Sequence, residues 1–326
     1  MRPGHLLDGR FRLTEAISRS GMAVIYKAED TQKGNQLVAV KIPHLRYELD
    51  PNYFSRFKRE EEIGRALNHP FLLKFIPVEN KSRPYLVTEY LSGCTLSHLI
   101  HAQGTFSEKD ALQIGSFLCD AIRHMHEHGV VHRDLKPANV MVVRDHTIRL
   151  VDFGIASSAA ARRITMAGGF TAGMGTPDYM APEQVRNKQC DARTDIYSLG
   201  VILYEMLTGV LPFQDENPWI AMNNRVHGDP VAPRKLNPAI SAQAEEIVLH
   251  CLQRDPGNRY TSAAELKMEL DAPGKVFVSG YCNRLEPARF RIGLRETPVL
   301  AGTILGVGFI ALQVVAFLLI RHIGHR

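Results

Sequence analysis

The sequence predicts an α+β fold, with strands near its N-terminal end and helices after them, followed by a single transmembrane helix. Residues 10–16, 23–29 and 37–42 alternate apolar and polar side chains or run apolar, as sheet strands do. Residues 107–129 instead repeat apolar side chains with a helical period. Residues 299–320 are uncharged and mostly apolar. As a helix they would span about 33 Å, close to the thickness of a bilayer core.

Two helices follow the strands. The first is expected at residues 54–67, ending before an Asn-His-Pro sequence. The second begins at Ser107, which forms a capping box with Asp110, and it ends at Gly129. Histidines at the end of the second helix are expected to be solvated, because the helix dipole favours them there. These histidines are His124, His126 and His128. The apolar stripe of this helix comprises Ile114, Phe117, Leu118, Ala121, Ile122 and Met125.

Two charged motifs after the second helix contain the candidate catalytic and metal-binding residues. The string His-Arg-Asp-Leu-Lys-Pro-Ala-Asn ends at Asn139, and the triplet Asp-Phe-Gly begins at Asp152. Asp134 could accept the proton of a hydroxyl group, and Lys136 could steady a phosphoryl group in transfer. Asn139 and Asp152 offer the hard oxygen ligands that Mg²⁺ prefers. The motifs therefore predict transfer of a phosphoryl group from Mg-ATP to a hydroxyl group.

A hairpin is expected between the two motifs. Residues 139–143 and 147–151 are short apolar runs joined by Arg-Asp-His, and this pattern would fold Asn139 back toward Asp152. The alternative is a surface loop that is charged by chance. An ordered string of this length rarely arises by chance, although a single triplet often does.

With these motifs, the chain resembles the eukaryotic-like (Hanks-type) serine/threonine protein kinases of bacteria over roughly residues 10–270. The family's other motifs occur in its order and at its spacing. Val-Ala-Val-Lys ends at Lys41, Ala-Pro-Glu ends at Glu183, and Asp-Ile-Tyr-Ser-Leu-Gly begins at Asp195. Arg259 is similar to the arginine that pairs with the glutamate of the Ala-Pro-Glu motif.

The resemblance implies a two-lobed protein kinase fold and a serine/threonine kinase activity. Residues 1–91 would form the small lobe, a β-sheet plus one helix, and residues 92–271 the large, mainly helical lobe. Residues 175–180 resemble the platform that seats a protein substrate, which disfavours a small-molecule phosphotransferase with the same fold. Thr176, together with Lys136, resembles the pattern specific for serine and threonine rather than for tyrosine.

The resemblance also assigns residues to ATP. Lys41 would grip the phosphates and pair with Glu60, although Glu61 and Glu62 are adjacent carboxylates. That pair would form only when its helix is swung in, which makes it a switch. Backbone groups of the hinge would bind adenine, beside a threonine gatekeeper. The expected nucleotide-binding residues are Ile17, Ser18, Ser20, Gly21, Ile25, Lys41, Thr88, Glu89 and Leu91.

The phosphate loop departs from the family pattern. Its three glycine positions hold Ser18, Ser20 and Ala23, and only Gly21, one residue after the second position, remains. A Cβ atom at each site costs backbone freedom and closeness to the phosphates, so weaker nucleotide binding is expected. This departure supports the alternative of a pseudokinase that acts as a membrane-bound binding scaffold. The retained catalytic and metal-binding residues favour an active enzyme.

Regulation by phosphorylation is expected in the activation segment, between Gly154 and Gly175. Arg133 precedes the catalytic Asp134, and in the family such an arginine commonly pairs with a phosphate on the activation segment. Thr171 is the first candidate to carry that phosphate, and Thr165 is the second.

Charge and cysteine content exclude other functions. The chain has 39 Lys+Arg and 34 Asp+Glu, a net charge of +5. Residues 272–326 hold seven basic and two acidic residues, so residues 1–271 are neutral. A neutral domain argues against a nucleic-acid partner. The five cysteines show no C-x-x-C pairing, which fits reduced thiols in a cytosolic domain better than a zinc site.

The remaining segments predict a membrane anchor. Residues 272–298 would be a basic juxtamembrane linker, residues 299–320 the membrane helix and residues 321–326 a short tail. Because the preceding flank is richer in arginine than the tail, the positive-inside rule places the kinase domain on the cytoplasmic face of the inner membrane. Gly302 and Gly306 form a G-x-x-x-G pair, which leaves a homodimer open.

Overall fold

The structure of the protein is a computed structural model. The chain divides into two units, Met1–Ala288 and Arg289–Arg326. The predicted membrane helix at 299–320 lies outside the described residues. Within the part of the chain that is described, no helix is both long and apolar enough to cross a membrane. The residues that the structure describes, all in the first unit, are 2–48, 50–143, 147–152 and 177–286.

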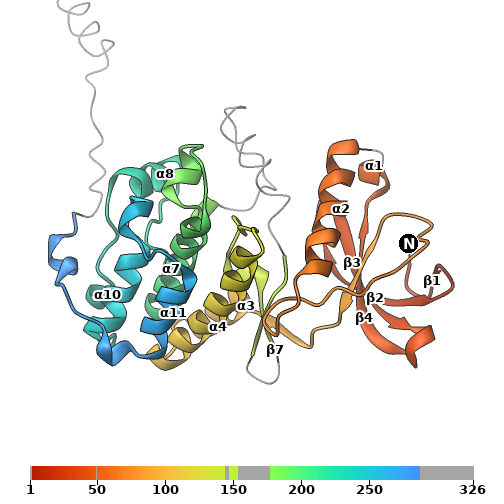
Figure 1. Cartoon of the computed structure of the whole chain (residues 1–326), viewed down its shortest axis with the longest axis horizontal. Helices are drawn as coiled ribbons and strands as arrows, with labels where there is room; N and C mark the ends of the chain where they lie inside the picture. Colours follow the sequence, from red (N-terminus) through yellow and green to blue (C-terminus); the bar gives the residue numbers. More distant parts are fainter. Residues whose placement is uncertain (1, 49, 144–146, 153–176, 287–326) are drawn as a thin grey trace, which may run out of the picture. The chain divides into compact units, whose positions relative to one another are not determined.

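The small lobe contains an antiparallel sheet of five strands in sequence order (Figure 1). The three strands predicted from the sequence are confirmed. The first begins one residue later and ends three residues later than expected, the second ends one residue later, and the third is one residue longer at each end. One face of the sheet is filled by side chains such as Phe11, Tyr26 and Val40, which are buried as their alternation requires. The strands are β1 (Leu6–Leu7), β2 (Phe11–Arg19), β3 (Ala23–Asp30), β4 (Gln36–Pro43) and β5 (Leu86–Glu89).

The helix of the small lobe begins three residues earlier than expected. Helix α2 (Pro51–Ala66) starts there because the Asp50 side chain accepts hydrogen bonds from the N–H groups of Asn52 and Tyr53, and proline is favoured at a first helical position. A short helix that the sequence did not predict, α1 (Leu45–Glu48), precedes it. Figure 1 shows α2 beside the sheet.

The predicted hairpin after the catalytic motif is confirmed. Strands β7 (Val140–Val143) and β8 (Ile148–Leu150) pair antiparallel, and β6 (Gly93–Thr95) adds a third strand. The N–H group of Val151 donates to the Asn139 carbonyl at 2.9 Å. The hairpin therefore brings the ends of the two motifs together.

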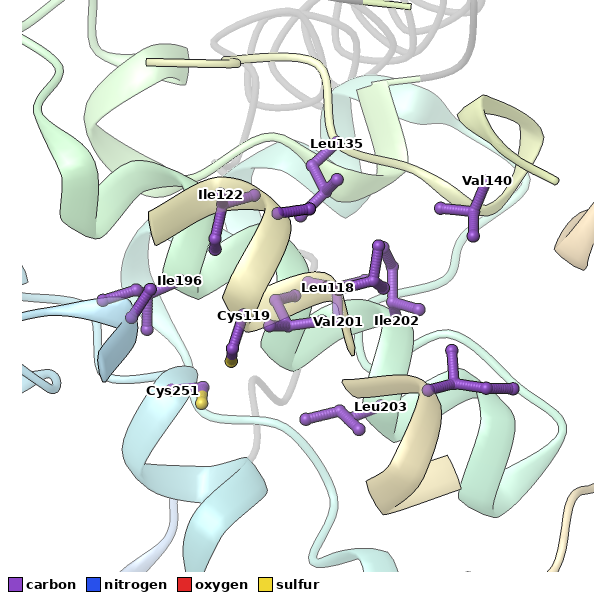
Figure 2. Close-up of a cluster of buried hydrophobic side chains, with 14 of the residues drawn as sticks. Leu118, Cys119, Ile122, Leu135, Val140, Ile196, Val201, Ile202, Leu203 and Cys251 are labelled. Carbon is purple, nitrogen blue, oxygen red and sulfur yellow. The ribbon is translucent and has the colours of Figure 1, made fainter. Parts of the chain in front are cut away.

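The described remainder of the large lobe is mainly helical, which confirms the two-lobed fold. Ser107 caps α4 by accepting from the Asp110 N–H at 3.1 Å. Figure 2 shows the core that α4 forms with α7 and α10, where Leu118, Ile122 and Val201 lie among other buried side chains. The helices are α3 (Leu96–Gln103), α4 (Glu108–Glu127), α6 (Pro182–Val185), α7 (Ala192–Thr208), α8 (Pro218–His227), α9 (Pro233–Leu236), α10 (Ala242–Cys251) and α11 (Ala263–Asp271).

Residues 272–286, the first part of the predicted linker, pack on the large lobe. Val276 contacts its hydrophobic core. At the end of the segment, the Glu286 N–H donates to the Asp229 carboxylate at 3.0 Å, and the Asp229 N–H donates to the Glu286 carbonyl at 3.1 Å. The folded unit thus extends about fifteen residues past the predicted boundary at 271.

Candidate active site

The loop that carries the catalytic motif is held by the carboxylate of Asp195, which is 0% exposed. Its Oδ2 accepts the N–H of His132 at 2.9 Å, and its Oδ1 accepts the N–H of Arg133 at 2.8 Å. These bonds hold Arg133 at φ +64°, a left-handed conformation that a non-glycine residue rarely adopts. A third donor, Nε2 of His126, lies 2.7 Å from Oδ2. The carboxylate thus fixes the backbone directly before Asp134.

Three functional side chains converge on this loop. Lys136 Nζ donates to Asp134 Oδ2 at 2.8 Å. The side-chain amide of Asn139 donates to the Asp134 carbonyl at 2.9 Å and lies 3.3 Å from Oδ2 of the same residue. Because the amide nitrogen is used in this way, the Asn139 Oδ1 atom remains as an acceptor for a cation. The Asp134 carboxylate, the Lys136 ammonium and the Asn139 amide oxygen are therefore held within one hydrogen-bonded group.

A second charged group joins strand β4 to helix α2. Lys41 Nζ lies 2.7 Å from Glu60 Oε1 and 3.0 Å from Oε2. Burial acts to lower the pKa of Lys41, but the carboxylates of Glu60 and Asp152 outweigh it and raise that pKa. Burial raises the pKa of Glu60, and Asp152 adds to the increase, against the effect of Lys41. The charges of Lys41, Glu60 and Asp152 are therefore coupled across the site.

The expected hinge residues lie where the chain leaves β5. Thr88 is buried, Leu91 is half-buried, and the Glu89 side chain accepts a hydrogen bond from the Lys74 N–H. The Glu89 N–H donates to the Lys74 carbonyl at 3.0 Å, and the Glu89 carbonyl accepts from the Thr88 hydroxyl group at 3.3 Å. Glu89 can therefore offer a nucleotide the second lone pair of that carbonyl.

The phosphate loop is a tight turn between β2 and β3. Ser20 Oγ accepts the N–H groups of Met22 at 3.3 Å and Ala23 at 3.0 Å, and it donates to the Ala23 carbonyl at 3.1 Å. Two amides that glycine would leave open for a phosphate are thus occupied by a hydroxyl group. Of the flanking residues, Ile17 is exposed at a register shift of β2, and Ser18 pairs with Ile25.

The end of the activation segment is attached to the large lobe by a buried ion pair. Arg259 Nη1 and Nη2 each donate to one oxygen of Glu183 at 2.8 Å, and Thr194 donates to the same carboxylate at 2.9 Å. The remaining guanidinium protons go to backbone carbonyls, including that of Gln253 at 2.7 Å. A buried pair satisfied in this way is costly to break, because either partner alone would be an uncompensated charge.

Three of the expected site residues, Thr165, Thr171 and Thr176, lie outside the described residues. Arg133, the predicted partner of a phosphate, has an exposed side chain.

Several supporting residues were not predicted. Gln184 donates to the Arg133 carbonyl at 2.8 Å and accepts the Ala181 N–H at 2.9 Å, which joins the catalytic loop to α6. The buried Arg225 donates to the Asp178 carbonyl at 2.6 Å beside the predicted substrate platform.

The expectation of solvated histidines was wrong for His126, whose ring donates to Asp195, and for His124, whose ring stacks on that of His69 with its Nε2 atom buried. His128 is exposed as expected. The only signal in the sequence was the helical spacing between His126 and the buried apolar residues of α4.

Comparison with known proteins identifies the family of the chain. The model of the protein kinase domain matches residues 11–270. The chain belongs to the protein kinase family. This kinase domain is 36% identical over 275 residues to serine/threonine-protein kinase PknB of Mycolicibacterium smegmatis, covering 82% of this chain and 43% of the relative. It is 38% identical over 271 residues to the probable serine/threonine-protein kinase SCO3848 of Streptomyces coelicolor, covering 82% and 40%.

A solved structure shows the same fold. The crystal structure of Rad53 in complex with AMP-PNP superposes with a TM-score of 0.65 at 28% identity, covering 79% of this chain and 64% of that one. The family uses ATP with a divalent metal and acts on proteins. The chain spans about two fifths of the length of the curated relatives named above.

The occupied amides of the phosphate loop lead to a prediction about nucleotide affinity. Ser20→Ala removes the hydroxyl group and keeps the Cβ atom, and Ser20→Gly removes both. Each variant should lower the dissociation constant for ATP about fivefold, because the released amides regain a hydrogen bond worth about 1 kcal/mol. Calorimetric titration measures the constant, with Ser55→Ala on the exposed side of α2 as the control. An unchanged constant in the Ser20→Ala variant would show that the hydroxyl group does not compete with phosphate.

Proposed function

We propose that the chain is a serine/threonine protein kinase that transfers the γ-phosphate of Mg-ATP to hydroxyl groups of protein substrates. The observation that carries the proposal is the hydrogen-bonded group of Asp134, Lys136 and Asn139. The pairing of Lys41 with Glu60, whose charges are coupled to Asp152, supports it.

Proton transfer in this reaction falls to Asp134. Its Oδ2 already accepts from Lys136, so Oδ1 is the atom that takes the proton of the substrate hydroxyl. As that proton leaves, a bond forms between the hydroxyl oxygen and the γ-phosphorus, and the bond to the bridging oxygen of ADP breaks. The Lys136 ammonium faces the charge on the moving phosphoryl group.

Asn139 and Asp152 would hold Mg²⁺, or Mn²⁺ in its place. The fit rests on the donor set, an amide oxygen left unused by the hydrogen bonds of Asn139 together with a carboxylate. When bound, the ion would neutralise charge on the phosphates of ATP. Lys41, held by Glu60, would bind those phosphates from the small lobe.

A pseudokinase scaffold is the second candidate, favoured by the amides that Ser20 occupies. A scaffold would not need the geometry of Asp134, Lys136 and Asn139, so we give it second place.

Transfer of radiolabel separates the two candidates. The full-length chain, in detergent, is incubated with γ-labelled ATP and Mg²⁺ or Mn²⁺, beside an Asp134→Asn variant that keeps the shape of the side chain. We expect labelled protein from the wild type and at least about a 100-fold lower rate from the variant, because the general base is lost. Equal labelling of both, or no labelling of either, would contradict the proposal.

The labelled sample also tests regulation. The exposed Arg133 supports phosphorylation of the activation segment, where a phosphate would form charge-assisted hydrogen bonds with the guanidinium group. Peptide mapping should place label on Thr171 or Thr165, and the Thr165→Ala/Thr171→Ala double variant should lose activity. Full activity in the double variant would remove this switch.

We further propose that residues 299–320 anchor the kinase to the cytoplasmic face of the inner membrane. The support is the uncharged apolar run and the arginines that precede it. Contact between two copies through Gly302 and Gly306 would bring kinase domains together for phosphorylation in trans.

Removal of the anchor is predicted to release the protein. Deletion of residues 298–326 should move the chain from the membrane fraction to the soluble fraction and leave its catalytic rate within about twofold, because the site lies in the first unit. Fractionation followed by immunoblotting measures the distribution. Gly302→Leu/Gly306→Leu is the control, which should stay in the membrane but crosslink less. Recovery of full-length protein in the soluble fraction without detergent would refute the anchor.

A further inference from the structure

The tip of the phosphate loop is held from outside by the chain that follows β4. Three successive backbone carbonyls at the tip each accept a hydrogen bond from this segment. His44 Nε2 donates to the Ser20 carbonyl at 3.0 Å, and Arg46 Nη2 donates to the Gly21 carbonyl at 2.8 Å. The backbone N–H of His44 donates to the Met22 carbonyl at 2.9 Å.

These contacts also set the direction of the loop amides. A trans peptide unit is planar, and its C=O and N–H groups point in opposite directions. When the carbonyls of Ser20, Gly21 and Met22 are fixed, the N–H groups of Gly21, Met22 and Ala23 are therefore fixed on the other side. Backbone amides aligned in this way can bind an anion. The N–H groups of Met22 and Ala23 donate to Ser20 Oγ in the structure, so a phosphate oxygen must take the place of that hydroxyl group to accept them.

Residues 43–48, here called the brace, are themselves attached to the rest of the small lobe. The Arg83 guanidinium forms an ion pair with Glu48 and lies 3.3 Å from the Pro43 carbonyl, so both ends of the segment are held. The Arg46 guanidinium lies 4.8 Å from the centre of the Tyr47 ring.

An aromatic stack continues from the segment into helix α2. The Tyr47 ring lies 5.1 Å from that of Tyr53, which lies 6.0 Å from that of Phe57. Because α2 also carries Glu60, the brace connects the phosphate loop to the helix that holds Lys41.

We propose that His44 and Arg46 are positioning residues that align the loop amides for the phosphates of a nucleoside triphosphate. Glycines normally let such a loop approach phosphate through backbone freedom, and here Ser18, Ser20 and Ala23 restrict that freedom. Hydrogen bonds from the side chains of the brace fix the amide orientation that a glycine-rich loop would reach through its own flexibility. The inference rests on the proposed function, since it assigns ATP as the ligand.

The test compares ATP with adenosine, which lacks phosphates. Arg46→Ala should raise the dissociation constant for ATP about fivefold, by loss of one net hydrogen bond, and leave that for adenosine unchanged. His44→Ala should act in the same direction, and His44→Gln, which keeps a side-chain N–H donor, should restore affinity. Arg12→Ala is the matched control, because this exposed arginine of β2 pairs with Glu29 at 3.6 Å.

Three results would overturn the inference. The first is an unchanged ATP constant in Arg46→Ala. The second is an equal loss of adenosine affinity, which would make the brace a general support of the small lobe. The third is an effect that vanishes at high salt, because direct attraction between Arg46 and phosphate is screened and positioning is not.

Amide hydrogen exchange provides a readout that needs neither nucleotide nor catalysis. In the Arg46→Ala variant, the N–H groups of Met22 and Ala23 should exchange faster than in the wild type, and in Arg12→Ala they should not. Unchanged exchange would refute the brace even if the protein is an active kinase. A wild-type chain that binds adenosine but not ATP would refute both the brace and the proposed function.

Discussion

The arrangement of the active site depends on one buried carboxylate. Asp195 is 0% exposed, and among the described residues its carboxylate accepts the N–H groups of His132 and Arg133 and the ring N–H of His126. The three bonds offset the cost of the left-handed conformation of Arg133. Because that residue directly precedes Asp134, the carboxylate sets where the proposed general base lies.

The large lobe holds this geometry through buried contacts, and the corresponding contact of the small lobe is less buried. Arg259 and Glu183 form a buried, fully hydrogen-bonded pair, and Gln184 connects α6 to the catalytic loop. By contrast, the Lys41–Glu60 pair is partly exposed and depends on the position of one helix. The catalytic loop is thus held by buried hydrogen bonds, whereas the Lys41–Glu60 pair forms only when α2 brings Glu60 to Lys41.

Elements with a clear hydrophobic period could be predicted from the sequence, and so could motif residues. The strands, the hairpin and α4 alternate or repeat over enough residues to decide their type. Helix α1 has four residues, too few for any period, and the packing of residues 272–286 depends on distant partners such as Asp229. His126 and Arg225 were missed for the same reason, because their partners are far away in sequence.

The most direct test of the account is the turnover of an Asp195→Asn variant. Asparagine has the same shape, but its NH₂ group would face an N–H donor of the loop, which leaves one donor unsatisfied and shifts Asp134. We predict that kcat for phosphoryl transfer falls at least about 100-fold and that the unfolding midpoint falls by roughly 2–8 °C, because one buried donor loses its partner, while the ATP dissociation constant stays nearly unchanged. A variant with wild-type kcat would contradict the claim that this carboxylate positions the catalytic loop.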